Sequence, residues 1–505
     1  MSELIRFGDP EQFEIAARWL KDSEPRSRLP VSEGWSTGEL CITVCGQVLT
    51  EHHFRGKISS NLSWYLSPVI DWLIRNWACL LHEENFGWPE KSAQPAAVAT
   101  FSALERFIAS TSDADSRTYQ KIHDWWSRHA LRAADSSAVY PDLYFRRVAD
   151  DIEISWLTRQ PSFAPADFSL TLGPGFALLS VDTVATALWK FLDWATKSAP
   201  ATDAADQQVA DGLRSRFANL SNTPISELEQ CYVGPQLQRQ LDTVRKSIDL
   251  PNDRRLIGKL PVIESLDSAV LMFGGLNVDI EQADIRCLLS FLASQKGQVE
   301  SDALAELVGN PQSGVWLRPH EEGYGLALDC RDDLGIEPDR VFIDIDDVLA
   351  KLGITVQEEA LSTRTIRGVA VAGQGFGPGI LINTNSAYNN NGPGRRFTLT
   401  HEFCHILYDR TRAKKLSHLS GPWTSGRTEK RANAFAAMFL APPSAIRIQL
   451  VDHTPEAVRQ LANNVGMGVT ALIEHLYNFD LIDDVEREQL KQYFVRPEQF
   501  DPSRR

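Results

Sequence analysis

His401, Glu402 and His405 form an HExxH pattern in the stretch His401-Glu402-Phe403-Cys404-His405. If this stretch is helical, side chains at i and i+4 project from one face, so the two imidazoles can hold a single zinc ion (Zn²⁺) from the same side. Glu402 lies one position further round the helix and would point toward water on the open side of the metal, where a carboxylate acts as a general base. The pattern therefore predicts metal-assisted hydrolysis, with His401 and His405 as ligands and Glu402 as the base.

A catalytic zinc ion usually has three protein ligands, and Glu429, 24 residues after His405, is the predicted third. It lies in the stretch Thr428–Leu440, whose spacing is helical and which ends before Pro442. Two alternatives stay open. Glu429 is a solvated charge favoured by the helix dipole, or His418 in the preceding polar loop is the ligand instead.

Asn433 follows Glu429 by one helical turn, on a face that also carries Ala432 and Ala436. Small side chains on this face allow two helices to approach closely. The amide of Asn433 can then orient a metal-bound imidazole through its second ring nitrogen. Asn433 is therefore the predicted partner of one ligand rather than a ligand itself.

The motif helix is predicted to be buried. Asn389–Gly394 breaks the chain before it, while Phe397 and Tyr408 extend the stripe that holds the histidines. Buried histidines need a partner, because unpaired polar groups in a core are costly. Zinc is one such partner, and backbone carbonyls are the alternative. Cys404 lies on the wrong side of the histidine pair to join it and is predicted to be a core residue.

Several segments of the C-terminal third resemble the ImmA/IrrE family of zinc metallopeptidases. The resemblance covers roughly residues 336–490 and includes both helices above, the strand before the motif and a closing helical segment. The similar segments are Val341–Ile354, Gly379–Asn383, Arg396–Leu407, Glu429–Leu440 with Pro442, and Leu461–Ile482. The resemblance implies a gluzincin-like site, in which His401, His405 and Glu429 hold zinc and Glu402 activates water.

Members of this family are tied to the cleavage or inactivation of transcriptional repressors in mobile elements and stress responses, and others to toxin–antitoxin or phage-defence systems. The resemblance therefore implies an endopeptidase that acts on one specific protein partner, such as a repressor-like regulator or an antitoxin. An extended substrate would pair with the edge of a strand beside the site. The candidate strand consists of Gly379, Ile380, Leu381, Ile382 and Asn383, for which an ordinary structural strand is the alternative.

The whole chain is predicted to be a multidomain α+β protein, because 505 residues exceed the size of one ordinary domain. Eleven of the 13 tryptophans precede residue 195, which marks residues 1–200 as a separate Trp-rich mixed α/β domain, a candidate sensor or substrate-recognition domain. Residues 207–335 are predicted to be a mainly helical connecting region. Residues 336–490 would form the peptidase-like domain: motif helix, small sheet and a helix-turn-helix-like cap at 455–482. The second cap helix lacks the side chains of a DNA reader.

Charge and cysteine content argue against several functional classes. A formal charge of −15 and a pI near 5.3 argue against broad nucleic-acid or anionic-membrane binding. The apolar stretches near 62–81 and 176–198 contain charged residues and are predicted to be amphipathic core helices rather than membrane spans. Seven scattered cysteines, without the spacing of a disulfide framework, and a start that is no signal peptide predict a cytoplasmic location.

Two functions remain open. The first is a cytoplasmic zinc-dependent endopeptidase with a protein or peptide substrate; the second is a non-catalytic interaction or regulatory protein with a structural zinc site. Glu402 favours the first, because a structural zinc ion needs no base. Tyr388, Tyr408 and His453 are candidates for stabilising the oxyanion, with packing or surface roles as the alternative. The pair Arg395-Arg396 is predicted to be solvated loop charge.

Overall fold

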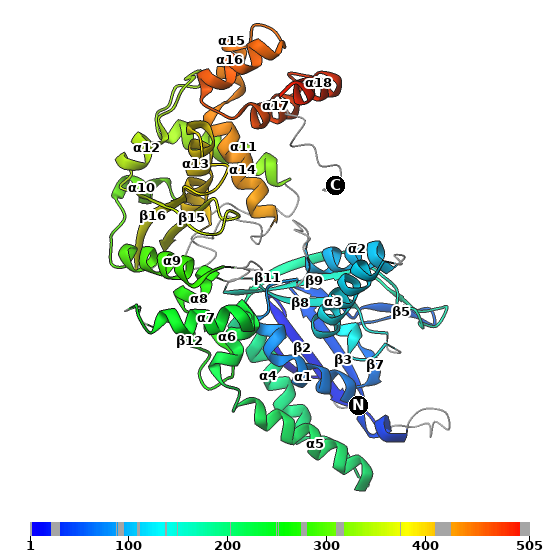
Figure 1. Ribbon diagram of the computed structural model, residues 1–505. Helices are drawn as coiled ribbons and strands as arrows, with labels where there is room; N and C mark the ends of the chain where they lie inside the picture. Colours follow the sequence, from blue (N-terminus) through cyan, green and yellow to red (C-terminus); the bar gives the residue numbers. More distant parts are fainter. Residues whose placement is uncertain are drawn as a thin grey trace. The chain divides into compact units, whose positions relative to one another are not determined.

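The chain forms a mixed α+β structure with several small sheets, which confirms the α+β part of the predicted fold class (Figure 1). This computed structural model describes residues 3–21, 31–86, 88, 95–108, 112–136, 139–148, 150–202, 204–248, 250, 252–273, 280–309, 318–373, 375–409 and 426–494. Two compact units are present. The first consists of Met1–Arg239 with Pro251–Asn277, and the second of Gln240–Leu250 with Val278–Arg505. The three-part division predicted from the sequence stays a prediction.

The described residues of the first unit form four small sheets and several helices. Its strands are β1 (Ile5–Asp9), β2 (Phe13–Trp19), β3 (Thr37–Val44), β4 (Gln47–Val48), β5 (His52–Phe54), β6 (Lys57–Ser59), β7 (Leu62–Tyr65), β8 (Asp142–Val148), β9 (Asp151–Leu157), β10 (Ser169–Leu170), β11 (Gly175–Ser180), β12 (Arg255–Leu256) and β13 (Ile263–Ser265). Its helices are α1 (Ser67–His82), α2 (Ala96–Ile108), α3 (Asp113–His129), α4 (Val181–Lys197), α5 (Ala204–Leu220), α6 (Ile225–Val233) and α8 (Ser268–Phe273), with 3₁₀ turns at Val31–Ser36 and Leu131–Ala133. The boundary between the units falls within α7 (Pro235–Arg245).

Tryptophans contribute much of the core of the first unit. Trp72, Trp77 and Trp125 are fully buried, and several others pack partly buried against the same clusters. The two apolar stretches expected to be amphipathic helices contain α1 and α4, each with one buried face. Among the described residues, no helix combines the length and apolarity that crossing a membrane requires.

The second unit is mainly helical around one three-stranded sheet. Its helices are α9 (Gln282–Gln295), α10 (Asp302–Leu307), α11 (Pro319–Asp333), α12 (Ile345–Lys351), α13 (Gly392–Tyr408), α14 (Gly426–Leu440), α15 (Pro443–Gln449), α16 (Pro455–Val465), α17 (Val469–Asn478) and α18 (Asp484–Phe494). Its strands are β14 (Thr355–Glu359), β15 (Gly368–Gly373) and β16 (Phe376–Asn383). The helix pair predicted from the HExxH motif and the Glu429 stretch corresponds to α13 and α14, which contact each other.

The strand β16 lies in the middle of this sheet, parallel to β14 and antiparallel to β15. Its residues alternate between two buried faces, and Ile380 and Ile382 pack into the same core as α13 and α14. The prediction that Gly379–Asn383 presents an open edge is wrong, because Gly379 to Ile382 pair with strands on both sides. Among the described residues, β15 pairs with β16 alone and is the edge strand nearest to α13.

The helix α13 begins where the sequence provides a cap. The side chain of Asn391 accepts a hydrogen bond from the backbone N–H of Gly394 at 2.8 Å, and a proline stands in the first turn, where its missing N–H costs nothing. Every residue from Thr398 to Tyr408 is buried. Such an all-round buried helix is what the apolar flanks of the motif predicted, and it removes both histidines from bulk water.

Aromatic packing fixes α14 against α13. The ring of Phe403 meets those of Phe435 and Phe439 at centroid distances of 6.2 and 6.0 Å in edge-to-face geometry, and Tyr408 meets Phe435 at 5.8 Å. The predicted alanine face is also buried, at Ala432 and Ala436. These contacts set the distance from which Glu429 reaches the histidines.

The pair Arg395-Arg396 corrects one prediction, because both residues lie on α13 and neither is a free loop charge. Arg395 forms a bidentate ion pair with Asp346 at 2.8 and 2.9 Å and a further one with Glu358 at 2.7 Å. Arg396 stacks on Phe342 and donates to the backbone carbonyls of Ile343, Val465 and Gly466. Arg395 thus attaches α12 and β14 to α13, and Arg396 attaches α13 to the turn between α16 and α17.

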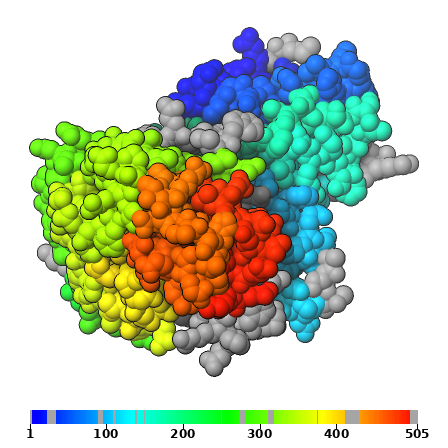
Figure 2. All heavy atoms as spheres, turned by 90° about the horizontal axis from the view of Figure 1, so that it is seen from above, coloured from blue at the N-terminus to red at the C-terminus, as the bar shows by residue number. Residues whose placement is uncertain are grey.

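Gly466 adopts the left-handed backbone conformation at φ 62°, where α16 ends. A Cβ at this position would lie 1.5 Å from Nη1 of Arg396. The predicted cap thus consists of two helices, α16 and α17, and the turn between them packs closely against the guanidinium of Arg396 on α13. Figure 2 shows the orange and red C-terminal part of the chain as one continuous surface.

Candidate metal centre

The two motif histidines face each other across one turn of α13. Their Nε2 atoms are 3.1 Å apart, and the side chains are 8 and 0 % exposed for His401 and His405, respectively. Among the described residues, the ring nitrogens of both histidines meet side chains only, and neither ring turns toward a backbone carbonyl as the metal-free alternative required. The helix therefore directs both Nε2 atoms to a common point.

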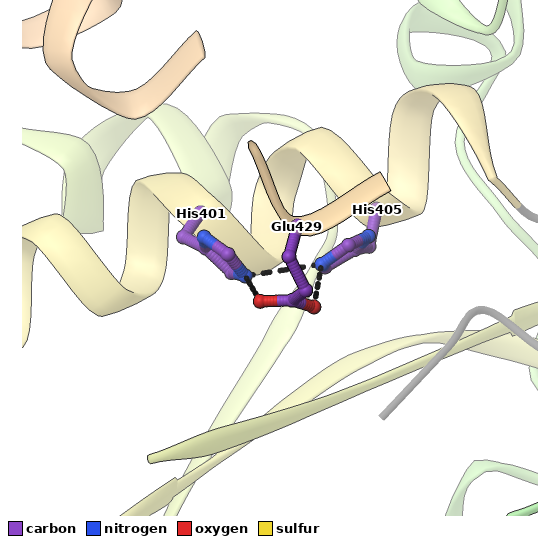
Figure 3. A group of neighbouring side chains, drawn as sticks. All are labelled: His401, His405 and Glu429. Carbon is purple, nitrogen blue, oxygen red and sulfur yellow. Dashed lines mark hydrogen bonds and ion pairs between the residues drawn. The ribbon is translucent and has the colours of Figure 1, made fainter. Parts of the chain in front are cut away.

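Glu429 reaches this point from the first turn of α14. One carboxylate oxygen lies 3.4 Å from Nε2 of His401, and the other lies 3.5 Å from Nε2 of His405 (Figure 3). The side chain is 16 % exposed, so it is not the solvated charge of the alternative interpretation. The ligand atoms of His401, His405 and Glu429 all lie within 4.8 Å of one another. The structure thus brings together the three residues predicted as ligands.

The remaining ring nitrogens determine where the imidazole protons are. Nδ1 of His401 lies 3.2 Å from the amide oxygen of Asn433, and Nδ1 of His405 lies 2.8 Å from a carboxylate oxygen of Asp409. Both partners are acceptors, so each neutral ring donates its N–H from Nδ1 and keeps a lone pair on Nε2. The carboxylate of Glu429 adds two more acceptors. Several lone pairs therefore converge, and neutral imidazoles provide no proton between them.

A zinc ion fits this donor set. Acceptors that converge in a buried place repel one another unless a cation lies between them. With Zn–N and Zn–O distances of about 2.0–2.2 Å, the edge of a ligand tetrahedron measures roughly 3.3–3.6 Å. The observed separations of 3.1, 3.4 and 3.5 Å are close to this value. Among the described residues, two imidazoles and one carboxylate form the donor set, which leaves a fourth position for water, as in catalytic rather than structural zinc sites.

Without a metal, a proton takes the place of the cation. Burial lowers the pKa of His405, but the hydrogen bonds to Asp409 and Glu429 outweigh this effect and raise the pKa to about 10. Burial raises the pKa of Glu429, but the two histidines hold it well below its ordinary value. Both pKa shifts show that the electrostatic potential at this point favours a positive charge.

Glu402 is fully buried, and its carboxylate lies against the start of β15. A Cβ on Gly368 would be 2.7 Å from Oε1 of Glu402 and 3.0 Å from its Cγ. Gly368 lies opposite Ile382, on the sheet face that packs toward α13. The absence of a side chain at position 368 therefore makes the space that the predicted base occupies.

Sequence reasoning missed Asp409, the acceptor of the His405 proton. Asp409 is fully buried and also binds the guanidinium of Arg431, whose other end meets Glu322 of α11 at 3.3 Å. Burial would raise the pKa of Asp409, but Arg431 and His405 hold it far below its ordinary value. The signal was available in part, because Asp409 follows His405 by one helical turn. Glu322 had no local signal, since it is 109 residues from Arg431.

The other candidates have different positions. Cys404 is buried in the core, as predicted, and burial raises the pKa of its thiol well above its ordinary value, so it stays protonated. Tyr408 donates to the carbonyl of Leu326 at 3.3 Å, and His453 pairs with Glu486 at 2.6 Å on the cap. Tyr388 is 57 % exposed beneath the guanidinium of Arg367. His418 lies outside the described residues.

Residues 349–477 match the peptidase M78 family, described as an IrrE N-terminal-like domain. The matched segment contains α13, α14 and all three strands of the sheet. It confirms the resemblance predicted for the C-terminal third and supports a metallopeptidase type of function, because the family is one of zinc metallopeptidases. No curated protein matches the chain.

Proposed function

We propose that the second unit is a zinc-dependent endopeptidase. The observation that carries the proposal is the convergence of lone pairs from His401, His405 and Glu429 around one buried point, next to a buried carboxylate on the adjacent residue Glu402. A structural zinc ion commonly has four protein ligands and needs no base. Three ligands and a base are the set that hydrolysis needs.

Asp409 and Asn433 hold the two imidazoles in the tautomer that presents Nε2. When bound, zinc would polarise the scissile carbonyl and lower the pKa of the attacking water. Glu402 then takes the water proton and delivers it to the leaving amine, which would otherwise depart as an unstable anion. Arg431 compensates the negative charge of Asp409, so that the buried site does not accumulate uncompensated carboxylates.

The substrate backbone is proposed to pair with β15 rather than with β16. An extended peptide can add to a sheet only at an edge, where backbone N–H and C=O groups lack a strand partner. Within the described ranges, β15 is the last strand of its sheet and pairs with β16 alone, and Gly368 at its beginning lies against Glu402. A peptide on this strand would pass beside the base.

The proposed target is a protein regulator, as the family resemblance implies: a repressor-like protein, an antitoxin or a regulator of stress or phage defence. A cytoplasmic location agrees with cysteines that are free at all seven positions. The first unit is a candidate for recognising this target or the trigger for its cleavage.

The test compares wild type with Glu402→Gln, using the zinc-loaded full-length chain and the regulator encoded beside its gene. Intact-mass spectrometry should show cleavage at one or few sites by wild type. Glu402→Gln should bind zinc equally and cleave roughly 10²–10⁴-fold more slowly, the range for loss of a general base. The matched control is Glu488→Gln, the same change at an exposed position of α18, which should leave cleavage unchanged.

The non-catalytic alternative predicts a different pattern. If zinc is only structural, wild type and Glu402→Gln both bind it. Neither then cleaves a regulator encoded beside the gene or any member of a pooled peptide library. Equal cleavage by wild type and Glu402→Gln would instead remove Glu402 as the base. A chain that binds no zinc would contradict both functions.

A further inference from the structure

The metal centre is connected to α11 by an unbroken series of buried polar contacts. His405 donates to Asp409, Asp409 accepts from Arg431, and Arg431 donates to Glu322. The side chains of Arg431 and Glu322 are only 3 and 6 % exposed. Burying two carboxylates and a guanidinium together is costly unless each charge has its partner. Glu322 therefore helps to neutralise Arg431, and the charge of Arg431 in turn affects Asp409, which accepts the proton of His405.

The backbone of α11 lies unusually close to α14 at this place. A Cβ on Gly323 would be 2.3 Å from the carbonyl oxygen of Arg431 and 2.9 Å from the Cβ of Ala434. A backbone atom cannot rotate away as a flexible side chain can, so only glycine permits this approach. Gly325, two residues later on the same helix, would place its Cβ in open space. The close contact is thus local to the residue beside Glu322.

Two further contacts attach α11 to the metal-binding helices. Arg331 donates to the carbonyl of Phe439 near the end of α14 at 2.7 Å, and Tyr408 of α13 donates to the carbonyl of Leu326 at 3.3 Å. α11 nevertheless lies before residue 349, where the family match begins. A segment outside the matched domain is therefore built into the support of the metal site.

We propose that Glu322 is a positioning residue for the metal centre, acting through Arg431 and Asp409, and that α11 thereby sets the affinity of the site for zinc. Without the negative charge of Glu322, Arg431 interacts more strongly with Asp409. Asp409 then accepts less well from His405, the Nε2 lone pair becomes less basic, and the site binds a dication more weakly. The inference rests on the proposed function only in taking zinc as the ion.

The first experiment measures zinc affinity of the full-length chain by competition with a chromophoric chelator. Glu322→Gln keeps an acceptor for Arg431 but loses the charge, and should weaken zinc binding on the order of 3- to 10-fold; Glu322→Ala should weaken it further. Asp329→Asn, which removes an exposed carboxylate from the same helix, should change nothing. Cobalt-substituted Glu322→Gln should also show a shifted visible absorption band, because the field around His405 changes.

The second experiment moves the helix without changing its charge. Gly323→Ala should force α11 away from α14 and weaken zinc binding at least as much as Glu322→Gln, whereas Gly325→Ala should bind zinc like wild type. In a double-mutant cycle, Asp409→Asn should abolish most of the effect of Glu322→Gln, because both changes act on one series of contacts.

Unchanged zinc affinity and cobalt spectrum in folded Glu322→Gln would overturn the proposal, as would strictly additive effects with Asp409→Asn. Circular dichroism and thermal unfolding separate a failure to fold from a change at the site, and Gly323→Ala gives an independent answer if Glu322→Ala does not fold. None of these measurements depends on proteolysis. A chain that binds zinc through this series but cleaves nothing would contradict the proposed endopeptidase and support this inference.

Discussion

Each unit contains a buried histidine paired with a carboxylate and an arginine. The two clusters differ in the partners of the second ring nitrogen of the histidine. In the first unit, His129 contacts Glu83 at 3.0 Å through Nε2 and the carbonyl of Phe145 at 2.7 Å through Nδ1. Arg128 fills the remaining acceptor sites of Glu83 at 2.9 and 2.7 Å. Both nitrogens of this histidine thus meet protein oxygens.

In the second unit, Nδ1 of His405 lies 2.8 Å from a carboxylate oxygen of Asp409, whereas its Nε2 lies 3.5 Å from the carboxylate of Glu429. This Nε2 also faces the Nε2 of His401, and both of its partners are acceptors. A buried histidine–carboxylate–arginine cluster therefore does not by itself indicate a ligand site. A ligand site is indicated by several hydrogen-bond acceptors that converge on one point, on side chains whose N–H groups already donate to other partners.

The largest expected difference between the clusters is in zinc binding after loss of the histidine. His405→Ala removes one of the three proposed ligands and should weaken zinc binding by more than about 100-fold, beyond the usual effect of losing an outer-shell partner. His129→Ala should destabilise the first unit and leave zinc affinity unchanged. Chelator competition on both variants measures the difference, and equal weakening would mean that the two clusters are not distinct in kind.

A smaller effect is expected when the carboxylate partner is neutralised. Asp409→Asn should weaken zinc binding by roughly 10- to 100-fold, because the acceptor that orients the imidazole loses its negative charge. Glu83→Gln should instead lower the free energy of unfolding by about 2 kcal/mol, through lost hydrogen bonds to charged donors, with no change in zinc affinity. Denaturant titration of the metal-free chains and zinc competition supply the two readouts. A zinc effect from Glu83→Gln would contradict the separation of the two clusters.

The pH dependence of zinc binding should be tenfold per pH unit. The pKa of His405 is raised to about 10 in the metal-free fold, because Asp409 and Glu429 outweigh burial. Zinc must displace this proton, so the apparent affinity rises with pH until about pH 10. Isothermal titration in buffers of different ionisation enthalpy at pH 6, 7 and 8 should detect the released proton. A flat affinity over this range would contradict the assignment of the proton to His405.

The same proton affects the stability of the metal-free chain. The pKa of His405 is raised from 6.5 to about 10, so its stabilising contribution is complete below pH 6.5 and is lost as the pH rises toward 10. Thermal unfolding of the chelator-treated protein should therefore shift downward between these values. Zinc-loaded protein, in which the proton is absent, is the control and should lack this component.

The smallest expected effect comes from Gly368. A methyl group 2.7 Å from the Glu402 carboxylate must displace it, so Gly368→Ala should lower kcat/KM roughly tenfold while zinc affinity stays within error. Gly173→Ala in the first unit adds a methyl to open space and should change neither quantity. Full activity of Gly368→Ala would show that the base tolerates movement or lies elsewhere.

The parts of the site that sequence predicted are those determined by local spacing. HExxH on a buried helix brings its two histidines together by helical geometry alone. Glu429 and Asn433 needed only a second helix with a small-residue face, and the structure places both beside the histidines. Assigning functional roles to them stays part of the proposal.

The parts that sequence missed depend on long-range packing. The residues of β16 do not determine its place in the sheet, because a strand buried on both faces has the same sequence pattern in the middle of a sheet as at its edge. In the structure, β16 is the middle strand and β15 is an edge strand. The pairing of Glu322 with Arg431 joins two helices that no local pattern relates. Arg395 and Arg396 looked like solvated charge because their partners, on α12, β14 and the α16–α17 turn, are distant in sequence.

The contact between Arg396 and the turn at Gly466 limits where this chain can be shortened. Arg396 is five residues before His401, and its guanidinium depends on the carbonyls of Val465 and Gly466 for hydrogen bonds. A recombinant fragment that stops before residue 465 would retain every predicted ligand and still lose these acceptors, beside the very helix that bears the histidines. Fragment design should therefore treat the last helices as part of the unit that positions the histidines rather than as a removable tail.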